Sequence, residues 1–590
     1  MKPMVAMLLL LSLQTGRTEM ASSPAALQRL AKDYYQWRDR NYPVRSSNEG
    51  LHTWDDKLTD YSPAAIQERR QYVRNLLPQV RRMKTDSWRR HDRINWLLFR
   101  AQLEEVEFYD RVLNFEGTNP KHYVDECSNA IFSLLKKDYD TPARRALSAA
   151  ARLKQMPAML EQGKQNLEKP VRLYARLAIE SARSIDSLFN SSLMTLVEQP
   201  PAGRVDGPGA GMASQSQPRS PSLSPGERAE LVRARDVALA ALHSFADWLE
   251  KKIPEMAVFT PMGEENYNFL LSRVYLLPLD AKQVAMLGEA ELARYRALES
   301  LLPDPTLADP NPSRVKKIPH DQDDFLKTYE NRQTEMIGFL KDKALVTLPD
   351  YLGPFRIRQL PEAFKPTSPG GFMNPPGLYD KDSSGFYFIP TYNAQSRNFY
   401  IRAAIEDPRP ILGHEGIPGH FLQLSIANHL ADEIRRQHTD GVFIEGWALY
   451  TEEMLMRTGL YPENSAAQGQ ILRLSRYRAA RIGVDVNLHT GKWSFEDAVN
   501  YFMEAGGLDR EAAEGEAAGA ASSPLQKITY MVGKWQIMRL LGKYRDRMGQ
   551  EFQLGKFHDD LLKNGSLPLS IVEWILLGDA TTLEKAVTAR

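Results

Sequence analysis

Apolar residues recur every three or four positions along most of the chain, with arginine, lysine, glutamate and glutamine between them. This spacing places the apolar side chains on one face of a helix, so it predicts amphipathic α-helices. The clearest early stretches are residues 62–83, 86–114 and 142–190. Ser62-Pro63 and Thr141-Pro142 are expected to begin two of them, because serine and threonine cap helix N-termini and proline suits the first helical position.

The helical pattern changes once, in the second half of the chain. Helices are predicted for residues 224–253, 264–275, 280–302 and 319–344, and again from Glu406 to the C-terminus. Between the last two, the β-prone runs 344–350, 355–360 and 385–392 predict short strands. The prediction is a mainly α protein with one small β-sheet.

Two segments depart from this pattern. Residues 198–225 are rich in proline, glycine and serine and nearly free of apolar residues, which predicts a disordered surface insertion. Residues 1–20 combine Lys2 with a short apolar run that ends at Leu13, a pattern typical of a secretory signal. We expect an exported periplasmic or extracellular protein in which residues 21–590 form one helical domain; a soluble protein with an apolar start is the alternative.

Charge and cysteine content exclude several functions. The 590 residues include 75 basic and 74 acidic ones, so no electrostatic argument favours nucleic acid as a partner. The N-terminal apolar run is too short to span a bilayer, and no stable membrane insertion is expected. The single cysteine, Cys127, permits no intrachain disulfide and no cysteine-based zinc site, and a buried thiol is its expected role.

The candidate chemistry begins with two histidines in the segment His414-Glu-Gly-Ile-Pro-Gly-His420. Their spacing of six residues leaves them roughly 120° apart on an ideal helix, where they would not share one metal ion. Pro418 and Gly419 can break the helix between them, because proline removes a backbone donor and glycine adopts angles that other residues avoid. The segment is therefore either part of a metal site on a deformed helix or a loop that merely contains two histidines.

Three glutamates complete this candidate site. Glu415 follows the first histidine directly, where zinc peptidases place their general base, and Glu445 is the candidate third ligand. Glu452 lies seven residues after Glu445 and hence on the same helix face, where it is expected to hydrogen-bond a ligating histidine or bind a substrate ammonium. A solvated acidic face is the alternative for Glu452 and is favoured more for its neighbour Glu453.

Further polar residues lie on predicted elements around this site. Arg481, Asp485 and His489 follow one another at intervals of four on an otherwise apolar helix, which predicts a buried network that is either catalytic or structural. The strand that contains Tyr387 precedes the histidine segment, and zinc peptidases often add the substrate to such an edge strand. An ordinary sheet strand is equally compatible. The hydroxyl of Tyr530 is a candidate donor to an oxyanion, although spacing alone does not prefer it over the other tyrosines.

These residues fall into blocks that resemble one known family. The blocks are H-E-x-x-P-G-H at His414–His420, E-G-W-A-x-Y at Glu445–Tyr450, an R-x-x-R-x-x-x-D-x-x-x-H helix with Arg478, Arg481, Asp485 and His489, and Y-x-x-G-K at Tyr530–Lys534. They resemble the bacterial family called domain of unknown function 885 (DUF885), which is similar in outline to helical zinc carboxypeptidases and dipeptidases of the gluzincin type. The resemblance covers nearly the whole chain.

The resemblance implies a mostly helical fold with a deep cleft and one zinc ion per chain. It implies that His414, His420 and Glu445 hold the zinc, that Glu415 is the base, and that His489 or Tyr530 is the oxyanion donor. The residues expected to support the ligands or bind substrate are Glu452, Arg478, Arg481, Asp485 and Tyr387. Residues 344–590 would carry the whole metal site, next to the small sheet.

The chain departs from the family pattern at two places. Phe421 stands where the family usually has a further histidine, and residues 516–523 lack an arginine that usually precedes the tyrosine block. If that arginine grips a substrate carboxylate, its absence weakens the case for C-terminal trimming. The preferred hypothesis is a zinc-dependent hydrolase of short peptides, carboxypeptidase- or dipeptidase-like. The alternatives are a non-catalytic peptide- or metal-binding protein on a peptidase fold and a purely structural helical scaffold.

Overall fold

The computed structural model describes residues 22–198, 223–302, 319–360, 371–396, 399–461 and 466–588. The predicted signal segment and almost all of the predicted 198–225 insertion lie outside these ranges. Within them the protein is mainly α-helical, which confirms the predicted class. None of the helices in these ranges is long and apolar enough to cross a membrane.

The first part of the chain is entirely helical in its regular elements. The α-helices are α2 (Pro24–Asn41), α3 (Pro43–Asn48), α4 (Pro63–Arg81), α5 (Arg90–Phe108), α6 (Phe115–Thr118), α7 (Lys121–Leu135), α8 (Pro142–Asn166), α9 (Arg172–Ser184), α10 (Leu193–Glu198) and α11 (Pro225–Lys252). Ser62 and Thr141 cap α4 and α8 as predicted. The predicted helix 142–190 is divided into α8 and α9, and Pro170, which removes a backbone donor, lies in the non-helical segment between them.

The second part contains the sheet and the remaining helices. These are α12 (Glu264–Phe269), α13 (Ala281–Ser300), α14 (Gln322–Asp342), β1 (Phe355–Gln359), β2 (Phe372–Asn374), β3 (Gly385–Ile389), α15 (Phe399–Glu406), α16 (Arg409–Glu415), α17 (His420–Asn428), α18 (Glu433–Arg436), α19 (Gly441–Arg457), α20 (Ala466–Thr490), α21 (Phe495–Tyr501), α22 (Arg510–Ser522), α23 (Thr529–Met548), α24 (Leu554–Leu562), α25 (Leu569–Leu577) and α26 (Thr581–Thr588). Short 3₁₀ and π segments extend or link several of them: His52–Trp54, Tyr109–Leu113, Leu188–Ser192, Ile253–Glu255, Leu270–Val274, Phe502–Gly506, Gln526–Ile528 and Gly549–Glu551.

The small sheet has the strand order β1-β3-β2. Strand β3 pairs in parallel with β1 along its whole length and in antiparallel fashion with β2. One expected strand is therefore absent, and of the two interpretations of the Tyr387 strand the ordinary sheet strand agrees with the structure. Residues 344–350 form no strand, and β3, which contains Tyr387, is the central strand and not an edge. Residues 386–388 of β3 pair with neighbouring strands on both sides, so this part of the strand offers no free hydrogen-bonding edge to a substrate.

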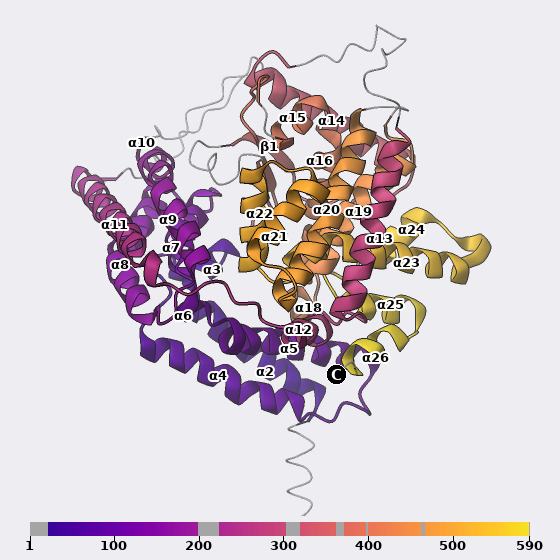
Figure 1. Cartoon of the computed structure of the whole chain (residues 1–590), viewed down its shortest axis with the longest axis horizontal. Coiled ribbons are helices and arrows are strands. Elements are labelled where there is room, and N and C mark those ends of the chain that lie inside the picture. Colours follow the sequence, from indigo (N-terminus) through magenta and orange to yellow (C-terminus); the bar gives the residue numbers. More distant parts are fainter. Residues whose placement is uncertain are drawn as a thin grey trace, which may run out of the picture.

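Figure 1 shows the helices in two groups above a shared base. Helices α7, α8, α9 and α11 form one group around their own apolar core, which includes the buried Cys127. Helices α16, α19, α20, α22 and α23 belong to the other group, and α2, α4 and α5 run along the base. The hydroxyl of Tyr174 on α9 donates to the carbonyl oxygen of Ala521 on α22 at 2.8 Å and so ties the two groups together.

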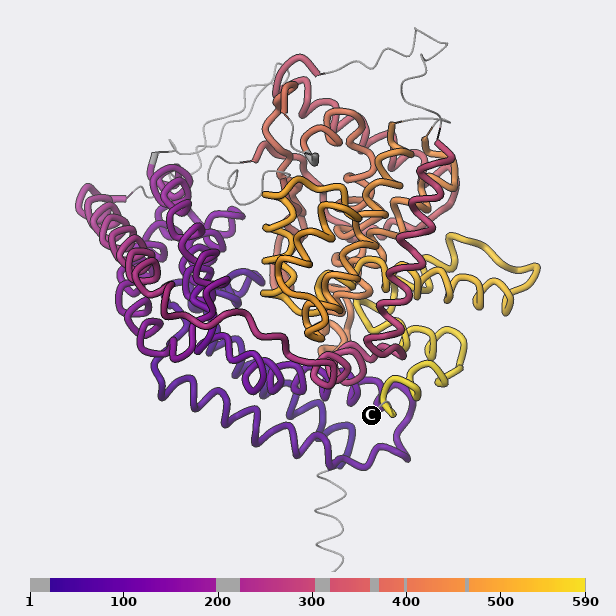
Figure 2. Tube along the Cα trace, viewed as in Figure 1, coloured from indigo at the N-terminus to yellow at the C-terminus, as the bar shows by residue number. Residues whose placement is uncertain are grey.

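The largest apolar core joins the beginning of the chain to its end. It contains Leu27 of α2 and Leu98 of α5 together with Val572 of α25 and Leu583 of α26. In the tube view the last helices, drawn in yellow, lie beside the indigo N-terminal helices (Figure 2). There the guanidinium of Arg93 lies 5.5 Å from the ring of Trp574. Helices from both ends of the chain thus contribute to one apolar core.

A buried histidine predicts how stability depends on pH. His558 on α24 donates through Nδ1 to the carbonyl oxygen of Leu345 at 2.6 Å, and its Nε2 lies 2.8 Å from the Tyr450 hydroxyl, from which it accepts. Burial lowers the pKa of His558 from 6.5 to about 4. Between these pH values the unfolded chain binds the proton and the folded chain does not. His558 is therefore expected to contribute a fall of up to about 3 kcal/mol in the free energy of unfolding as the pH drops from 6.5 to 4. The buried His438, whose pKa burial also lowers to about 4, acts in the same direction.

Urea unfolding at a series of pH values measures this effect. His558→Gln removes one of these titrating groups and is expected to make the decline between pH 6.5 and 4 shallower. His320→Gln changes an exposed histidine and is the matched control, which should keep the wild-type slope. An unchanged slope in His558→Gln would contradict the assignment.

Candidate metal centre

The two histidines of the candidate site lie on separate helices. Helix α16 ends at Glu415 and α17 begins at His420, so the chain is non-helical across the Pro418-Gly419 step, as predicted. A Cβ atom on Gly419 would lie 2.0 Å from the carbonyl oxygen of His414, which shows how tightly the chain folds back here. The indole of Trp447 on α19 donates to the Pro418 carbonyl oxygen at 2.8 Å and holds the turn against that helix.

This turn brings together the three predicted metal ligands. One ligand atom each from His414, His420 and Glu445 lie within 4.8 Å of one another, the single such group among the described residues. Oε2 of Glu445 lies 3.3 Å from Nε2 of His420 and 3.7 Å from Nε2 of His414. The interpretation of His414 and His420 as two unrelated loop histidines does not agree with this geometry.

The electrostatics of the group favour a positive charge. Burial lowers the pKa of His414, but Glu445 and Glu452 outweigh it and raise that pKa to about 9. Burial acts to raise the pKa of Glu445, yet the imidazoles of His420 and His414 hold it well below its usual range. Oε2 of Glu445 is buried and has no hydrogen-bond partner in the described part of the chain. A buried acceptor that faces two imidazole nitrogens is suited to a cation.

Glu452 lies behind the first ligand, as its position two turns after Glu445 predicts. Its Oε1 accepts from Nδ1 of His414 at 2.7 Å, which leaves Nε2 directed toward Glu445. Arg478 of α20 pairs with the same Oε1 at 3.3 Å. Glu453, for which a solvated face was favoured, is also buried, and it pairs with Lys534 of α23 and accepts from the hydroxyl of Tyr295. Both acidic residues therefore belong to the interior, because neighbouring helices supply cations to them.

A close helix crossing places Tyr530 beside the ligands. Helices α19 and α23 touch where a Cβ on Gly446 would lie 2.4 Å from Cα of Gly533. This contact explains why glycine stands in both sequence blocks. It sets the ring of Tyr530 parallel to that of His414, with centroids 6.3 Å apart. Burial and Glu445 raise the pKa of Tyr530 although Arg481 and Arg478 lower it, so its hydroxyl remains protonated and able to donate.

Glu415 lies at the C-terminal end of α16, close to the sheet. Its side chain is half-buried, and its charge contributes, after burial and Tyr329, to the raised pKa of Tyr387 on β3. Phe421, which replaces the further histidine of the family, is fully buried, and its ring stacks on Phe355 of β1 at 4.9 Å. That position therefore serves the contact between α17 and the sheet. The predicted sheet next to the metal-site helix is confirmed.

The predicted polar stripe on α20, formed by Arg481, Asp485 and His489, is buried, and its members contact different parts of the protein. Arg481 pairs with Glu516 at 2.9 Å, and its guanidinium lies 5.1 Å from the ring of Tyr530. Asp485 accepts from the backbone N–H groups of Leu525 and Lys527 at 3.1 Å each. It thereby holds the turn from which α23 and its tyrosine begin.

His489 is not brought to the metal ligands. Its Nε2 donates to the carbonyl oxygen of Ala520 at 2.9 Å, and its ring lies 5.9 Å from Phe259 and 6.2 Å from Tyr267. Eleven residues separate it from Arg478 on the same helix, a distance of roughly 16 Å along the axis. Of the two predicted oxyanion donors, the structure places only Tyr530 beside the ligands.

Two contributors to the site were not predicted from the sequence. Glu516 holds both Arg481 and, at 3.0 Å, Lys527, and no local spacing signals a contact between such distant segments. Trp447 could have been found, because it lies in the same block as Glu445. Its role as a donor to the Pro418 turn nevertheless depends on how α19 packs on that turn.

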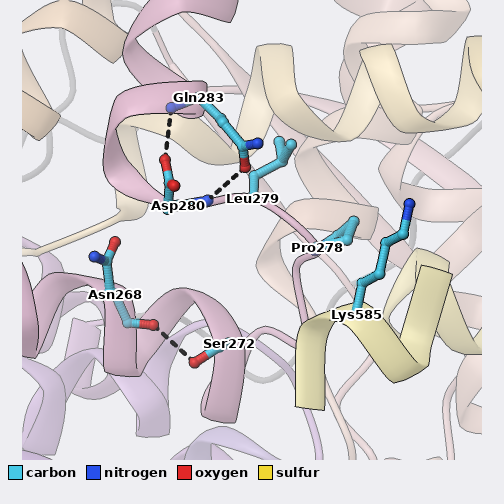
Figure 3. A pocket seen from close by; sticks show the side chains of 7 residues that line it. All are labelled: Asn268, Ser272, Pro278, Leu279, Asp280, Gln283 and Lys585. Atoms are coloured by element: carbon cyan, nitrogen blue, oxygen red, sulfur yellow. Dashed lines mark hydrogen bonds between the residues drawn. The ribbon is translucent and has the colours of Figure 1, made fainter. Parts of the chain in front are cut away.

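A separate pocket of about 120 Å³ contains none of these residues. Figure 3 shows it between α12, α13 and α26, with Lys585 directed along one side. Asp280 and Gln283 hydrogen-bond each other's backbone as a helix cap, and the Ser272 hydroxyl donates to the Asn268 carbonyl oxygen. Its polar groups thus serve local structure.

Fold and site together define a mainly helical protein with a His-His-Glu group suited to a metal ion. The chain belongs to the family described as "Bacterial protein of unknown function (DUF885)", which matches residues 43–576. The resemblance seen in the sequence blocks is therefore confirmed. A search of curated proteins finds no match.

Two solved structures have the same fold. One is described as "a putative lipoprotein of unknown function from Shewanella oneidensis"; it is 21% identical, with 94% of this chain and 100% of that chain covered and a TM-score of 0.70. The other is described as "the putative lipoprotein from Colwellia psychrerythraea"; it is 18% identical, with 94% and 99% covered and a TM-score of 0.72. At these identities the likeness concerns the fold alone.

Proposed function

We propose that this protein is a zinc-dependent hydrolase of short peptides. The observation that carries the proposal is the convergence of His414, His420 and Glu445, whose ligand atoms lie within 4.8 Å of one another. Two histidines and one glutamate are the ligand set of a large class of catalytic zinc sites, which keep a further position for water or substrate.

The two ligand separations that involve Glu445 are compatible with one zinc ion. With tetrahedral bonds of about 2.0–2.1 Å, ligand atoms lie about 3.3 Å apart. The two distances to Oε2 of Glu445 are 3.3 and 3.7 Å. The contact between Nδ1 of His414 and Glu452 is the outer-sphere hydrogen bond that zinc-ligating histidines usually make.

Zinc held there would lower the pKa of a water molecule toward about 7 and polarise the scissile carbonyl. Glu415 would accept a proton from the attacking water at its carboxylate and pass it to the leaving amine. Tyr530, protonated and beside His414, would donate its hydroxyl to the developing oxyanion.

We further propose that the protein is exported. The apolar N-terminal run supports this proposal, as does the likeness of fold to two structures described as lipoproteins. Export would place the enzyme among extracytoplasmic peptides, which suits a hydrolase of short peptides.

Metal analysis tests the zinc assignment. Purified protein is expected to contain one zinc per chain, and a chelator should remove zinc and peptide hydrolysis together, with both restored by added zinc. His420→Ala removes one of three ligands and should abolish stoichiometric zinc. His320→Ala, an exposed histidine, is the control. Full zinc content in His420→Ala would contradict the assignment, and zinc binding without turnover of a broad peptide library would favour the non-catalytic alternative.

A further inference from the structure

A third residue lies behind the first ligand and its glutamate. Arg478 is 7% exposed and comes from the middle of α20, a helix that contributes no ligand to the metal group. One of its nitrogens, Nη2, pairs with Oε1 of Glu452 at 3.3 Å. The same oxygen accepts from Nδ1 of His414 at 2.7 Å. His414, Glu452 and Arg478 thus meet at a single carboxylate oxygen.

The position of the Glu452 carboxylate depends on this shared oxygen. Its other oxygen, Oε2, is buried and has no hydrogen-bond partner in the described part of the chain. Two contacts, both on Oε1, therefore decide how the carboxylate is oriented. Without Arg478, only the His414 imidazole would contact the Glu452 carboxylate. That carboxylate is the group that orients the imidazole, so nothing else would fix its position.

Arg478 is held in turn by the aromatic ring of Tyr530. Its guanidinium carbon lies 5.5 Å from that ring's centroid, within the range of a cation–π contact. Its Nε and Nη1 are buried and have no hydrogen-bond partner among the described residues. The guanidinium is therefore located by Glu452 on one side and the Tyr530 ring on the other. A planar guanidinium can make both contacts, whereas a lysine ammonium behaves as a point charge.

We propose that Arg478 is a positioning residue for the metal centre. It acts through Glu452, which it orients so that His414 is kept with its proton on Nδ1 and its Nε2 free for the metal. Through its contact with the Tyr530 ring, it also holds the candidate oxyanion donor in register with the same ligand. This inference rests on the proposed zinc site and would hold whether or not the substrate is a peptide.

Zinc affinity, measured by competition with a chromogenic chelator, tests the inference without any activity assay. Replacing outer-sphere partners of zinc ligands commonly weakens metal binding about 10- to 100-fold. Arg478→Met is expected to show a loss in that range, and Arg478→Lys a smaller one. Glu452→Gln should resemble Arg478→Met. The double variant should bind zinc no more weakly than Glu452→Gln alone, because Arg478 acts through Glu452.

The matched control is Arg38 on α2. It is also buried, pairs with Asp39 at 2.8 Å, and lies 5.0 Å from the ring of Tyr35. Arg38→Lys and Arg38→Met should leave zinc affinity unchanged. Thermal unfolding of the zinc-free proteins identifies any variant that fails to fold, and Arg478→Lys keeps the charge in case Arg478→Met is one of them.

The outcomes separate this inference from the proposed function. Unchanged zinc affinity in both Arg478 variants overturns the inference alone. Losses that multiply in the double variant also overturn it, since Arg478 would then act independently of Glu452. A wild-type protein that binds no zinc overturns the proposed function, and the inference with it.

Discussion

Glu415→Gln is expected to reduce peptide hydrolysis about 10²- to 10⁴-fold while the protein keeps its zinc. Glutamine has nearly the shape of glutamate but cannot accept the proton of the attacking water. Glu415 is no member of the ligand group, so its replacement leaves His414, His420 and Glu445 intact. The measurement is turnover of a peptide library at saturating zinc, together with zinc content per chain.

Glu265→Gln is the matched control for this experiment. Glu265 is an exposed glutamate on α12, and its variant should retain wild-type turnover. Full activity in Glu415→Gln would remove Glu415 from the role of base. Loss of zinc in the same variant would show instead that Glu415 supports the metal.

Gly419→Ala is expected to destabilise the fold by about 3 kcal/mol or more and to weaken zinc binding. An added Cβ would lie 2.0 Å from the carbonyl oxygen of His414 and 2.3 Å from that of Gly413. Both obstacles are backbone atoms, so no side-chain rotation can relieve the contact. The turn between α16 and α17 must open, and His420 moves away from its partners.

Gly515→Ala tests whether this effect belongs to the turn. Gly515 lies on an exposed face of α22, and a Cβ there would meet nothing within 4 Å. Alanine is favoured over glycine inside a helix by about 1 kcal/mol, so this variant should be neutral or slightly more stable. The measurements are the free energy of unfolding in urea and the zinc affinity of both variants. Wild-type stability in Gly419→Ala would show that the turn does not need glycine.

Much of the local structure could be predicted from spacing. Periodic apolar residues predict the helices, and Ser62 and Thr141 predict where α4 and α8 begin. These signals involve neighbours within a turn or two of the helix. The seven-residue interval between Glu445 and Glu452 correctly placed both on one face of α19, where both reach His414. The helix break at Pro418-Gly419 followed from backbone chemistry alone.

The same local reasoning failed where contacts between distant segments determine the structure. The run 385–392 correctly predicts a strand, which the structure limits to residues 385–389, but whether the strand lies at an edge depends on two partners elsewhere in the chain. His489 shares a helical stripe with Arg481 and Asp485, yet the length of α20 carries it to the carbonyl oxygen of Ala520. A stripe shows that residues share a face and not that they share a site.

The sequence by itself determined the class of fold and the identity of the candidate ligands, because both depend on residue types at short range. Only the tertiary structure decided which of these residues meet. Glu445 reaches His414 because α19 packs on α16, where the Thr451 hydroxyl donates to the Gly413 carbonyl oxygen at 3.1 Å. Tyr530 reaches His414 because α19 and α23 cross at Gly446 and Gly533, and a Cβ on either glycine would collide with the other helix. Such a contact joins segments far apart in the chain, and its geometry depends on complete packing that no local pattern contains.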